Sequence, residues 1–390
     1  MTITTLAFAA LALVPAPQKM SVTDGAFSTN LVVSHVRDAK VPAEGYRLKV
    51  AADGVTVWSS DDAGRFYAGE TLKQLTEKGK CPLVEIEDAP RFRWRGVHFD
   101  DCRHFFGKET LKKTLDLMAQ HKLNVLHWHL TEDQGWRLDI PGYPELVKYG
   151  AVRSSSPKHG THPEFGASKE AQAAAADGKT YGPFYYTESD IREVVAYAAE
   201  RHIQVVPEIE LPGHFQAVLA AYPEFACFPD PSNRDPLCIW GISRNVMCIG
   251  NDQAIKFMED VLDYVCKLFP GDVVHIGGDE CPQVKWKTCP KCQARIKAEK
   301  LGDEKGLQPW ITKRFVKFLE ARGKRRARGR SPSSASGCRS RASASHVPSS
   351  GLCRWACSRC GWTARTSRRA TSCRAVIRTP YARSTASPTT

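Results

Sequence analysis

The sequence predicts an α/β fold in which parallel strands alternate with helices, preceded by a small α+β domain. Between residues 91 and 323, four apolar strand segments are each followed by a longer segment with helical spacing. This alternation is typical of βαβ units and a parallel sheet. Residues 15–88 differ, because short strand patterns there precede a single helix. The 390 residues suffice for two or three domains of about 100–200 residues each.

The α+β domain is predicted over residues 15–88. Tyr46–Val50 and Val55–Trp58 alternate apolar and polar residues, as half-buried strands do. Ala63–Leu75 places apolar residues near one helical face. We expect Glu85–Pro90 to be a connector between the two domains.

The second domain is predicted over residues 89–323. Thr187 stands three residues before Asp190 at a helix start, close to a capping box. The Gly-, Ser- and Ala-rich residues 150–186 are expected to form a loop over one end of the sheet. We expect strands at 94–99, 124–130, 203–210 and 273–276, and helices at 108–121, 187–201, 253–269 and 308–321. The inward-facing apolar side chains are expected to be Val97, Leu126, Val206 and Val274.

The amino-terminal residues 1–14 resemble the apolar part of a signal peptide, although no Lys or Arg precedes them. We therefore expect export to the periplasm or the cell exterior. No run of about 18 apolar residues occurs, so no membrane-spanning helix is expected.

The net charge of +13 comes from the C-terminal end. Residues 324–390 hold Lys324 and 14 Arg but no Asp or Glu, so they carry +15 and the rest carries −2. Such a composition is typical of a disordered basic tail. We favour translation out of frame, because no fifth strand is recognisable after Gly323. Scattered Arg residues without interleaved aromatics make a nucleic-acid partner an unfavoured interpretation.

Five of the 14 cysteines lie in the tail, and an odd number, nine, precede it. Cys289-Pro-Lys-Cys292 has the spacing of a zinc knuckle or a redox motif, but no second such pair accompanies it before the tail. A local disulfide or free thiols are the favoured interpretation. Metal binding and redox catalysis are the alternatives.

Acidic residues and histidines follow the predicted strands. Reacting groups in parallel α/β folds lie at the carboxyl ends of the strands. Four acidic strand ends in succession therefore predict a pocket lined by carboxylates and imidazoles. The four segments are His98–Phe106, His127–Trp136, Glu208–His214 and His275–Cys281.

Asp279 and Glu280 are adjacent just past the fourth strand, where both can face the pocket. One of two carboxylates in different environments can stay ionised while the other is protonated and acts as an acid. This pairing suits cleavage of a glycosidic bond. A metal site is the competing interpretation, although His127 and His129 have no supporting ligand pattern. Several tryptophans suit sugar rings: Trp94, Trp128, Trp136, Trp240 and Trp286.

Five motifs in chain order make the sequence resemble the family 20 glycoside hydrolases, the β-N-acetylhexosaminidases. They are Trp94-Arg-Gly-Val-His-Phe-Asp, Arg103-His-Phe-Phe, the segment from Asn124 to Arg137, Glu210-Leu-Pro-Gly-His and His275-Ile-Gly-Gly-Asp-Glu. The resemblance runs from about residue 12 to 323. It implies a (β/α)8 barrel of which about the first four β/α units are present, behind a small α+β domain.

The resemblance also implies substrate-assisted, retaining removal of terminal GlcNAc or GalNAc from β-linked glycans, without cofactor or catalytic metal. Glu280 would be the general acid and base, and Asp279 would orient the substrate's acetamido group. Arg95 matches an arginine that binds sugar hydroxyls. His214 would support Glu280 together with Glu132, where many relatives have Asp, or with Asp133.

Residues 324–390 match none of the later motifs of that family, including its Gly-Trp-Asp-Glu-type strand and the tryptophans around the acetamido group. The chain is therefore expected to be a β-N-acetylhexosaminidase whose barrel is cut short. The alternative is a non-catalytic, glycan-binding remnant.

The out-of-frame interpretation makes a testable prediction. One alternative reading frame of the gene beyond about codon 325 should encode a Gly-Trp-Asp-like strand and later strand ends bearing Trp and Tyr. Sequencing the gene checks this directly. If neither alternative frame encodes such segments, the tail is the natural continuation of the chain.

Overall fold

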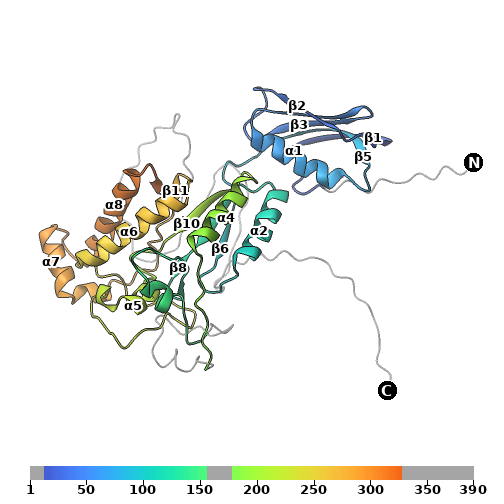
Figure 1. Ribbon diagram of the computed structural model, residues 1–390. Helices are drawn as coiled ribbons and strands as arrows, with labels where there is room; N and C mark the ends of the chain where they lie inside the picture. Colours follow the sequence, from blue (N-terminus) through green and yellow to red (C-terminus); the bar gives the residue numbers. More distant parts are fainter. Residues whose placement is uncertain (1–12, 156–177, 327–390) are drawn as a thin grey trace, which may run out of the picture. The chain divides into compact units, whose positions relative to one another are not determined.

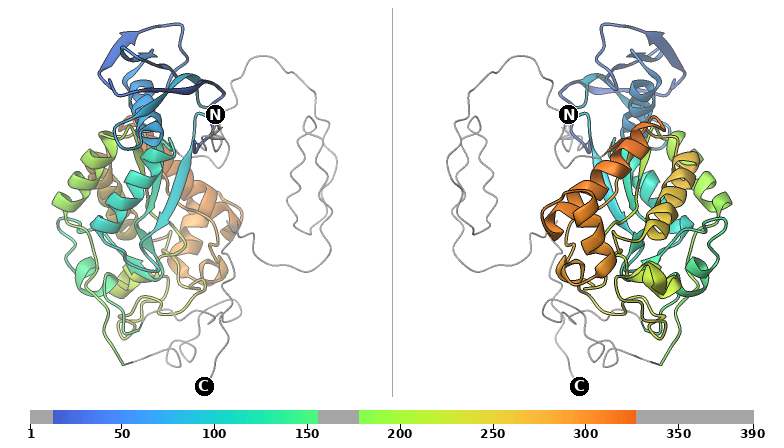
Figure 2. Two further views of the ribbon diagram at one scale, coloured as in Figure 1. Left: turned by 90° about the vertical axis from the view of Figure 1, so that its right-hand side faces the viewer. Right: turned by 90° about the vertical axis from the view of Figure 1, so that its left-hand side faces the viewer.

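The computed structural model of the protein describes residues 13–155 and 178–326 (Figures 1 and 2). All of them belong to one unit of the chain, Met1–Ser331. The expectations for the signal-like segment before Leu13, for the middle of the 150–186 loop and for the tail beyond Arg326 lie outside the described residues. Among the described helices, none has both the length and the apolarity that a membrane crossing requires.

The N-terminal domain is a five-stranded sheet with one helix, α1 (Asp62–Leu75), along one face (Figure 1). The strand order is β1-β5-β3-β4-β2, and only the β2–β4 pair is parallel. Alternate residues of β3 and β4 are buried, and side chains such as Leu48, Val57 and Tyr67 form the domain's own core. The strands are β1 (Lys19–Ser28), β2 (Val33–Arg37), β3 (Tyr46–Ala51), β4 (Gly54–Ser59) and β5 (Cys81–Asp88).

The expected connector at 85–90 is wrong, because most of it belongs to β5. Val84 and Ile86 are buried in β5, whereas Glu85 and Glu87 point to solvent. The alternation of apolar and charged residues from Val84 to Glu87 is the pattern of a half-buried strand.

The second domain is a parallel α/β structure. Its strands β6 (Gly96–Asp100), β7 (Val125–His129) and β10 (Gln204–Glu208) pair in parallel, and a Glu208–His275 bridge joins β10 to the next strand, β11 (Val273–Val274). Four helices lie in chain order around the strands (Figure 2). They are α2 (Lys108–Gln120), α4 (Glu188–Ala199), α6 (Asp252–Leu268) and α8 (Leu307–Glu320).

Shorter elements lie in the connections that follow the strands. They are β8 (Thr131–Glu132), β9 (Gly135–Trp136), η1 (Leu146–Gly150), α5 (Gln216–Ala221), η2 (Pro223–Phe225), η3 (Val284–Lys287), α7 (Pro290–Ala298) and η4 (Glu304–Gly306).

Of the four side chains that we expected on the inner face of the sheet, Val97, Leu126 and Val274 lie on the side of the covering helices instead. Leu126 and Val274 belong to the core that contains the helix side chains, and Val97 packs against that core. Val206 instead lies with Val125 and Val273 in a small separate cluster. Because successive side chains of a strand alternate between faces, an error of one residue exchanges the two faces.

A fifth strand does begin, contrary to our expectation. β12 (Arg325–Arg326) pairs in parallel with β11. Lys324 is buried just before it and donates hydrogen bonds to the carbonyl oxygens of Phe269, at 2.7 Å, and Gly271, at 2.8 Å. Strand pairing uses backbone groups, so a charged sequence conceals this start.

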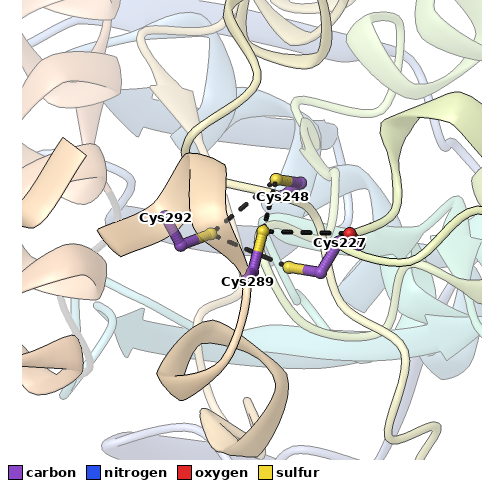
Figure 3. Close-up of side chains that lie close together, drawn as sticks. All are labelled: Cys227, Cys248, Cys289 and Cys292. Atoms are coloured by element: carbon purple, nitrogen blue, oxygen red, sulfur yellow. Dashed lines mark hydrogen bonds between the residues drawn. The ribbon is translucent and has the colours of Figure 1, made fainter. Parts of the chain in front are cut away.

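Nine cysteines are described, and none forms a disulfide. Cys289 and Cys292 do not pair locally. They lie instead beside Cys227 and Cys248, which come from a different connection (Figure 3).

The capping box of α4 gives a test of the fold. The Thr187 hydroxyl accepts from the Asp190 amide at 3.2 Å, and the Asp190 carboxylate accepts from the Thr187 amide at 3.1 Å. Thr187→Ala should lower the free energy of unfolding by about 1 kcal/mol, because it leaves a helix-end N–H unpaired. Ser189→Ala, exposed in the same turn, should change it by less than half as much in urea unfolding. Equal effects of the two substitutions would contradict the capping role.

Candidate active site

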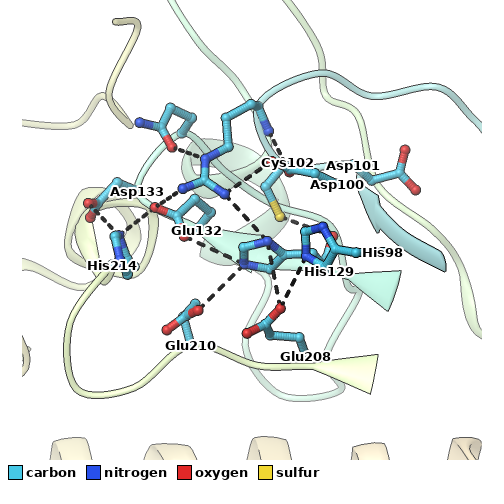
Figure 4. Close-up of polar contacts among 12 residues, drawn as sticks. His98, Asp100, Asp101, Cys102, His129, Glu132, Asp133, Glu208, Glu210 and His214 are labelled. Atoms are coloured by element: carbon cyan, nitrogen blue, oxygen red, sulfur yellow. Dashed lines mark hydrogen bonds and ion pairs between the residues drawn. The ribbon is translucent and has the colours of Figure 1, made fainter. Parts of the chain in front are cut away.

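The carboxyl ends of β6, β7, β10 and β11 bring acidic and basic side chains together, as Figure 4 shows for the first three. The arrangement is a consequence of parallel pairing, because the ends of parallel strands lie at one edge of the sheet. Each strand contributes side chains from its last residues or from the connection that follows.

His214 is the centre of one group of contacts. Its Nδ1 lies 2.6 Å from Glu132 Oε1 and 3.2 Å from Asp133 Oδ2, while its Nε2 lies 3.7 Å from Glu280 Oε2. The His214, Glu132 and Asp133 side chains are buried, whereas that of Glu280 is 55% exposed. A single imidazole therefore connects two buried carboxylates to one that solvent reaches.

The carboxylates determine the charge of His214. Burial alone would lower its pKa, but the hydrogen bonds to Asp133 and Glu132 raise the pKa of His214 to about 11. Burial raises the pKa of Glu132 to about 7, although the contact with His214 opposes this. We conclude that His214 is an imidazolium at neutral pH, because two acidic groups share its Nδ1.

Asp133 is held by the connection that follows β10. Its Oδ1 accepts from the Gln216 amide and its Oδ2 from the Ser243 amide, both at 2.9 Å. These backbone donors orient the carboxylate toward His214, so the imidazole has a defined position.

A second group surrounds Glu208, at the end of β10. Its Oε2 lies 2.8 Å from His127 Nε2, and its Oε1 lies 2.6 Å from His275 Nδ1. His98 contacts the same carboxylate at 3.5 Å. Burial would raise the pKa of Glu208, but hydrogen bonds from the three histidines hold it far below its usual range. Glu208 is thus a carboxylate that joins histidines of three other strands.

Arg103 lies just past the end of β6 and joins that end to the connection after β7. It contacts Asp100 Oδ2 at 3.0 Å, Glu132 Oε1 at 3.1 Å and Gln134 Oε1 at 3.0 Å. Its side chain is 21% exposed. The cation offsets part of the negative charge of these carboxylates.

The connection after β11 has an unusual backbone. Gly277 and Gly278 have φ of 55° and 103°, and Glu280 has φ of 43°. A Cβ at Gly277 would lie 1.7 Å from Glu210 Oε2, so a larger residue there would displace the Glu210 side chain and be strained by the positive φ. A positive φ is rare for a non-glycine residue, and such residues cluster at functional sites. This turn presents both Asp279 and Glu280 to solvent.

Comparison with known protein families shows which family the chain resembles. Residues 92–330 match the model of the glycosyl hydrolase family 20 catalytic domain, and residues 28–89 match domain 2 of the same family. This chain belongs to glycosyl hydrolase family 20.

A curated relative within family 20 is a β-hexosaminidase of Porphyromonas gingivalis, 42% identical over 293 residues, which are 72% of this chain and 35% of that protein. The structure resembles a crystal structure of a β-N-acetylhexosaminidase, with TM-score 0.71, 33% identity and coverage of 80% of this chain and 64% of that one. It also resembles a Vibrio harveyi exo-β-N-acetylglucosaminidase in complex with N-acetylglucosamine, with TM-score 0.68, 26% identity, and coverage of 80% and 54%.

These similarities assign the chain to the α/β TIM-barrel fold with a preceding domain. The chain spans about a third of the length of the Porphyromonas relative and about 60% of that of another, from Akkermansia muciniphila.

The structure brings Glu132, Asp133, His214 and Glu280 together, with Asp279 adjacent in the chain, but it does not bring Arg95 to them. Arg95 immediately precedes β6, at the opposite end of the strand. Its side chain bonds to Glu44 and donates to the Lys122 carbonyl at 2.7 Å. It therefore connects the second domain to the N-terminal domain, and its position does not support a role in sugar binding.

Arg103 had no expected role, although Arg103-His-Phe-Phe is one of the five motifs that resemble the family. The signal was position: Arg103 follows its strand, whereas Arg95 precedes it, and only the carboxyl end carries the site. Three of the tryptophans suggested for sugar binding are fully buried in the core: Trp128, Trp136 and Trp286.

His214 provides a pH test. A group whose pKa is raised by folding stabilises the fold fully below its unfolded pKa of about 6.5, and this contribution is lost as the pH rises through about 11. The free energy of unfolding should therefore fall between these pH values, and should fall less in His214→Gln. Urea unfolding across this pH range measures both.

His121→Gln is the matched control, because His121 is exposed at the end of α2. It should keep the pH dependence of the unsubstituted chain. If His214→Gln also keeps it, His214 is not protonated in the folded state.

Proposed function

We propose that the chain carries the acid–base half of a β-N-acetylhexosaminidase site, which removes terminal N-acetylhexosamine, GlcNAc or GalNAc, from the non-reducing ends of β-linked glycans. The observation that supports this most directly is the contact of His214 with Glu280 on one side and with Glu132 and Asp133 on the other. A solvent-accessible carboxyl group supported by a buried charged imidazole suits repeated proton transfer.

The proposed reaction is substrate-assisted. The 2-acetamido oxygen of the sugar attacks the anomeric carbon while Glu280 donates its proton to the leaving glycosidic oxygen, and the C–O bond breaks. Asp279 orients the acetamido group and stabilises the positive charge of the oxazolinium intermediate. Glu280 then takes a proton from water, whose oxygen attacks the anomeric carbon. The bond from that carbon to the acetamido oxygen breaks, so the acetamide is restored and the product keeps the β configuration. Arg103 replaces Arg95 as the proposed donor to sugar hydroxyls.

We further propose that the chain contains about the first four β/α units of the barrel. The family match ends at residue 330, and the described parallel strands run from β6 to β12. The alternative function is glycan binding without catalysis. Export remains a proposal supported by the signal-like segment 1–14.

The acid role is tested by comparing leaving groups on a chain whose reading frame is restored beyond residue 326. Glu280→Gln should reduce kcat/KM by about 100-fold or more for a chitobiose-type substrate. A nitrophenyl glycoside should lose less in its first step, because its leaving group needs little protonation. Glu200→Gln, an exposed glutamate at the end of α4, should change neither rate.

Asp279→Asn should slow both substrates, because orientation and charge stabilisation are needed whatever group leaves. Equal losses for both substrates in Glu280→Gln would remove Glu280 from the acid role. Saturable GlcNAc binding without hydrolysis by the 390-residue chain itself would favour the remnant.

A further inference from the structure

Four cysteine thiols converge at a point away from the candidate active site. The four-cysteine cluster comprises Cys227, Cys248, Cys289 and Cys292 (Figure 3). Their Sγ atoms all lie within 4.8 Å of one another, and three of the sulfur pairs are 3.7 Å apart. Three of these cysteines have no exposed surface, and Cys227 is 9% exposed.

The spacing of the sulfur atoms distinguishes two chemistries. A disulfide has a sulfur–sulfur distance of about 2.05 Å. Four thiolates around one zinc ion, each about 2.3 Å from the metal at the corners of a tetrahedron, lie about 3.8 Å from one another. The 3.7 Å separations of the cluster match the second arrangement.

Backbone structure places each pair of cysteines independently of the thiols. Cys227 and Cys248 each directly follow a residue of the antiparallel bridge between Ala226 and Met247. Cys289 is the N-cap residue of α7, and Cys292 lies in the first turn of that helix. A helix N-terminus favours a thiolate. The cluster is therefore presented by two separate backbone scaffolds, the bridge and the start of α7.

The two scaffolds approach each other closely at Gly250. A Cβ there would lie 2.1 Å from the Lys291 backbone carbon and 2.5 Å from the Cys292 amide nitrogen. Only glycine permits this approach, so the chain is shaped to bring the second pair of thiols against the first.

We propose that Cys227, Cys248, Cys289 and Cys292 bind one Zn²⁺ ion in a closed tetrathiolate site. The Cys289-Pro-Lys-Cys292 segment supplies two of the four ligands. The Cys227 and Cys248 pair supplies the other two. Four protein ligands leave no open position, so the site is structural. It would join the connection after β10, which carries His214, to the connection after β11, which carries Glu280.

Metal analysis of the full 390-residue chain tests this. The chain is purified under reducing conditions with added Zn²⁺, then transferred to metal-free buffer, and metal is counted by plasma mass spectrometry. We expect the cluster to bind one zinc ion per chain. Cys248→Ser and Cys292→Ser should each lose this zinc ion. Cys266→Ser, in α6 outside the cluster, should keep it.

The tail contains another closely spaced pair, Cys357-Ser-Arg-Cys360, so a Cys357→Ser, Cys360→Ser double variant is a second control and should also keep the cluster's zinc. Replacement of zinc by Co²⁺ in the unsubstituted chain should give the intense thiolate-to-cobalt charge-transfer absorption of a tetrathiolate. This readout remains decisive if the serine variants do not fold.

Three results would overturn the proposal. One is a chain without stoichiometric zinc whose four cluster thiols all react with alkylating reagent after unfolding. The second is a mass lower by two hydrogens for each disulfide among these cysteines. The third is iron in place of zinc after purification in the presence of both metals.

Discussion

The parallel pairing of β6, β7, β10 and β11 is the constraint on which the rest of the structure depends. Parallel strands place their carboxyl ends at one edge, so side chains separated by more than a hundred residues meet there without any local signal between them. Glu208 contacts His127 on one neighbouring strand and His275 after another. The helices cover the other face and contribute many of the buried apolar side chains.

Charge is compensated within the site rather than excluded from it. Burying an unpaired carboxylate is costly, yet Glu132, Asp133 and Glu208 are all buried. Each contacts a histidine, and Arg103 adds a further cation next to Glu132. Glu280 differs because it is exposed, and it is the member of this group that a substrate could reach.

The connections after β10 and β11 must hold His214 and Glu280 within 3.7 Å, although they share no regular secondary structure. Trp286 is fully buried and its Nε1 donates to the Met247 carbonyl at 3.0 Å, which ties one connection to the other. The four-cysteine cluster lies between the same two connections. Both contacts restrict the loop that presents Glu280.

The sequence by itself determined the order of strands and helices in the second domain, because apolar spacing is a local property that survives without the fold. Through the resemblance of its motifs it also suggested Glu132, Asp133, His214 and Glu280, which the structure brings into contact. The tertiary structure was needed to show that the Arg95 side chain bonds to Glu44 and the Lys122 carbonyl, whereas Arg103 contacts Glu132. Only the tertiary structure brought Cys227 and Cys248 to Cys289 and Cys292, because contacts between separate connections leave no periodic trace in the chain.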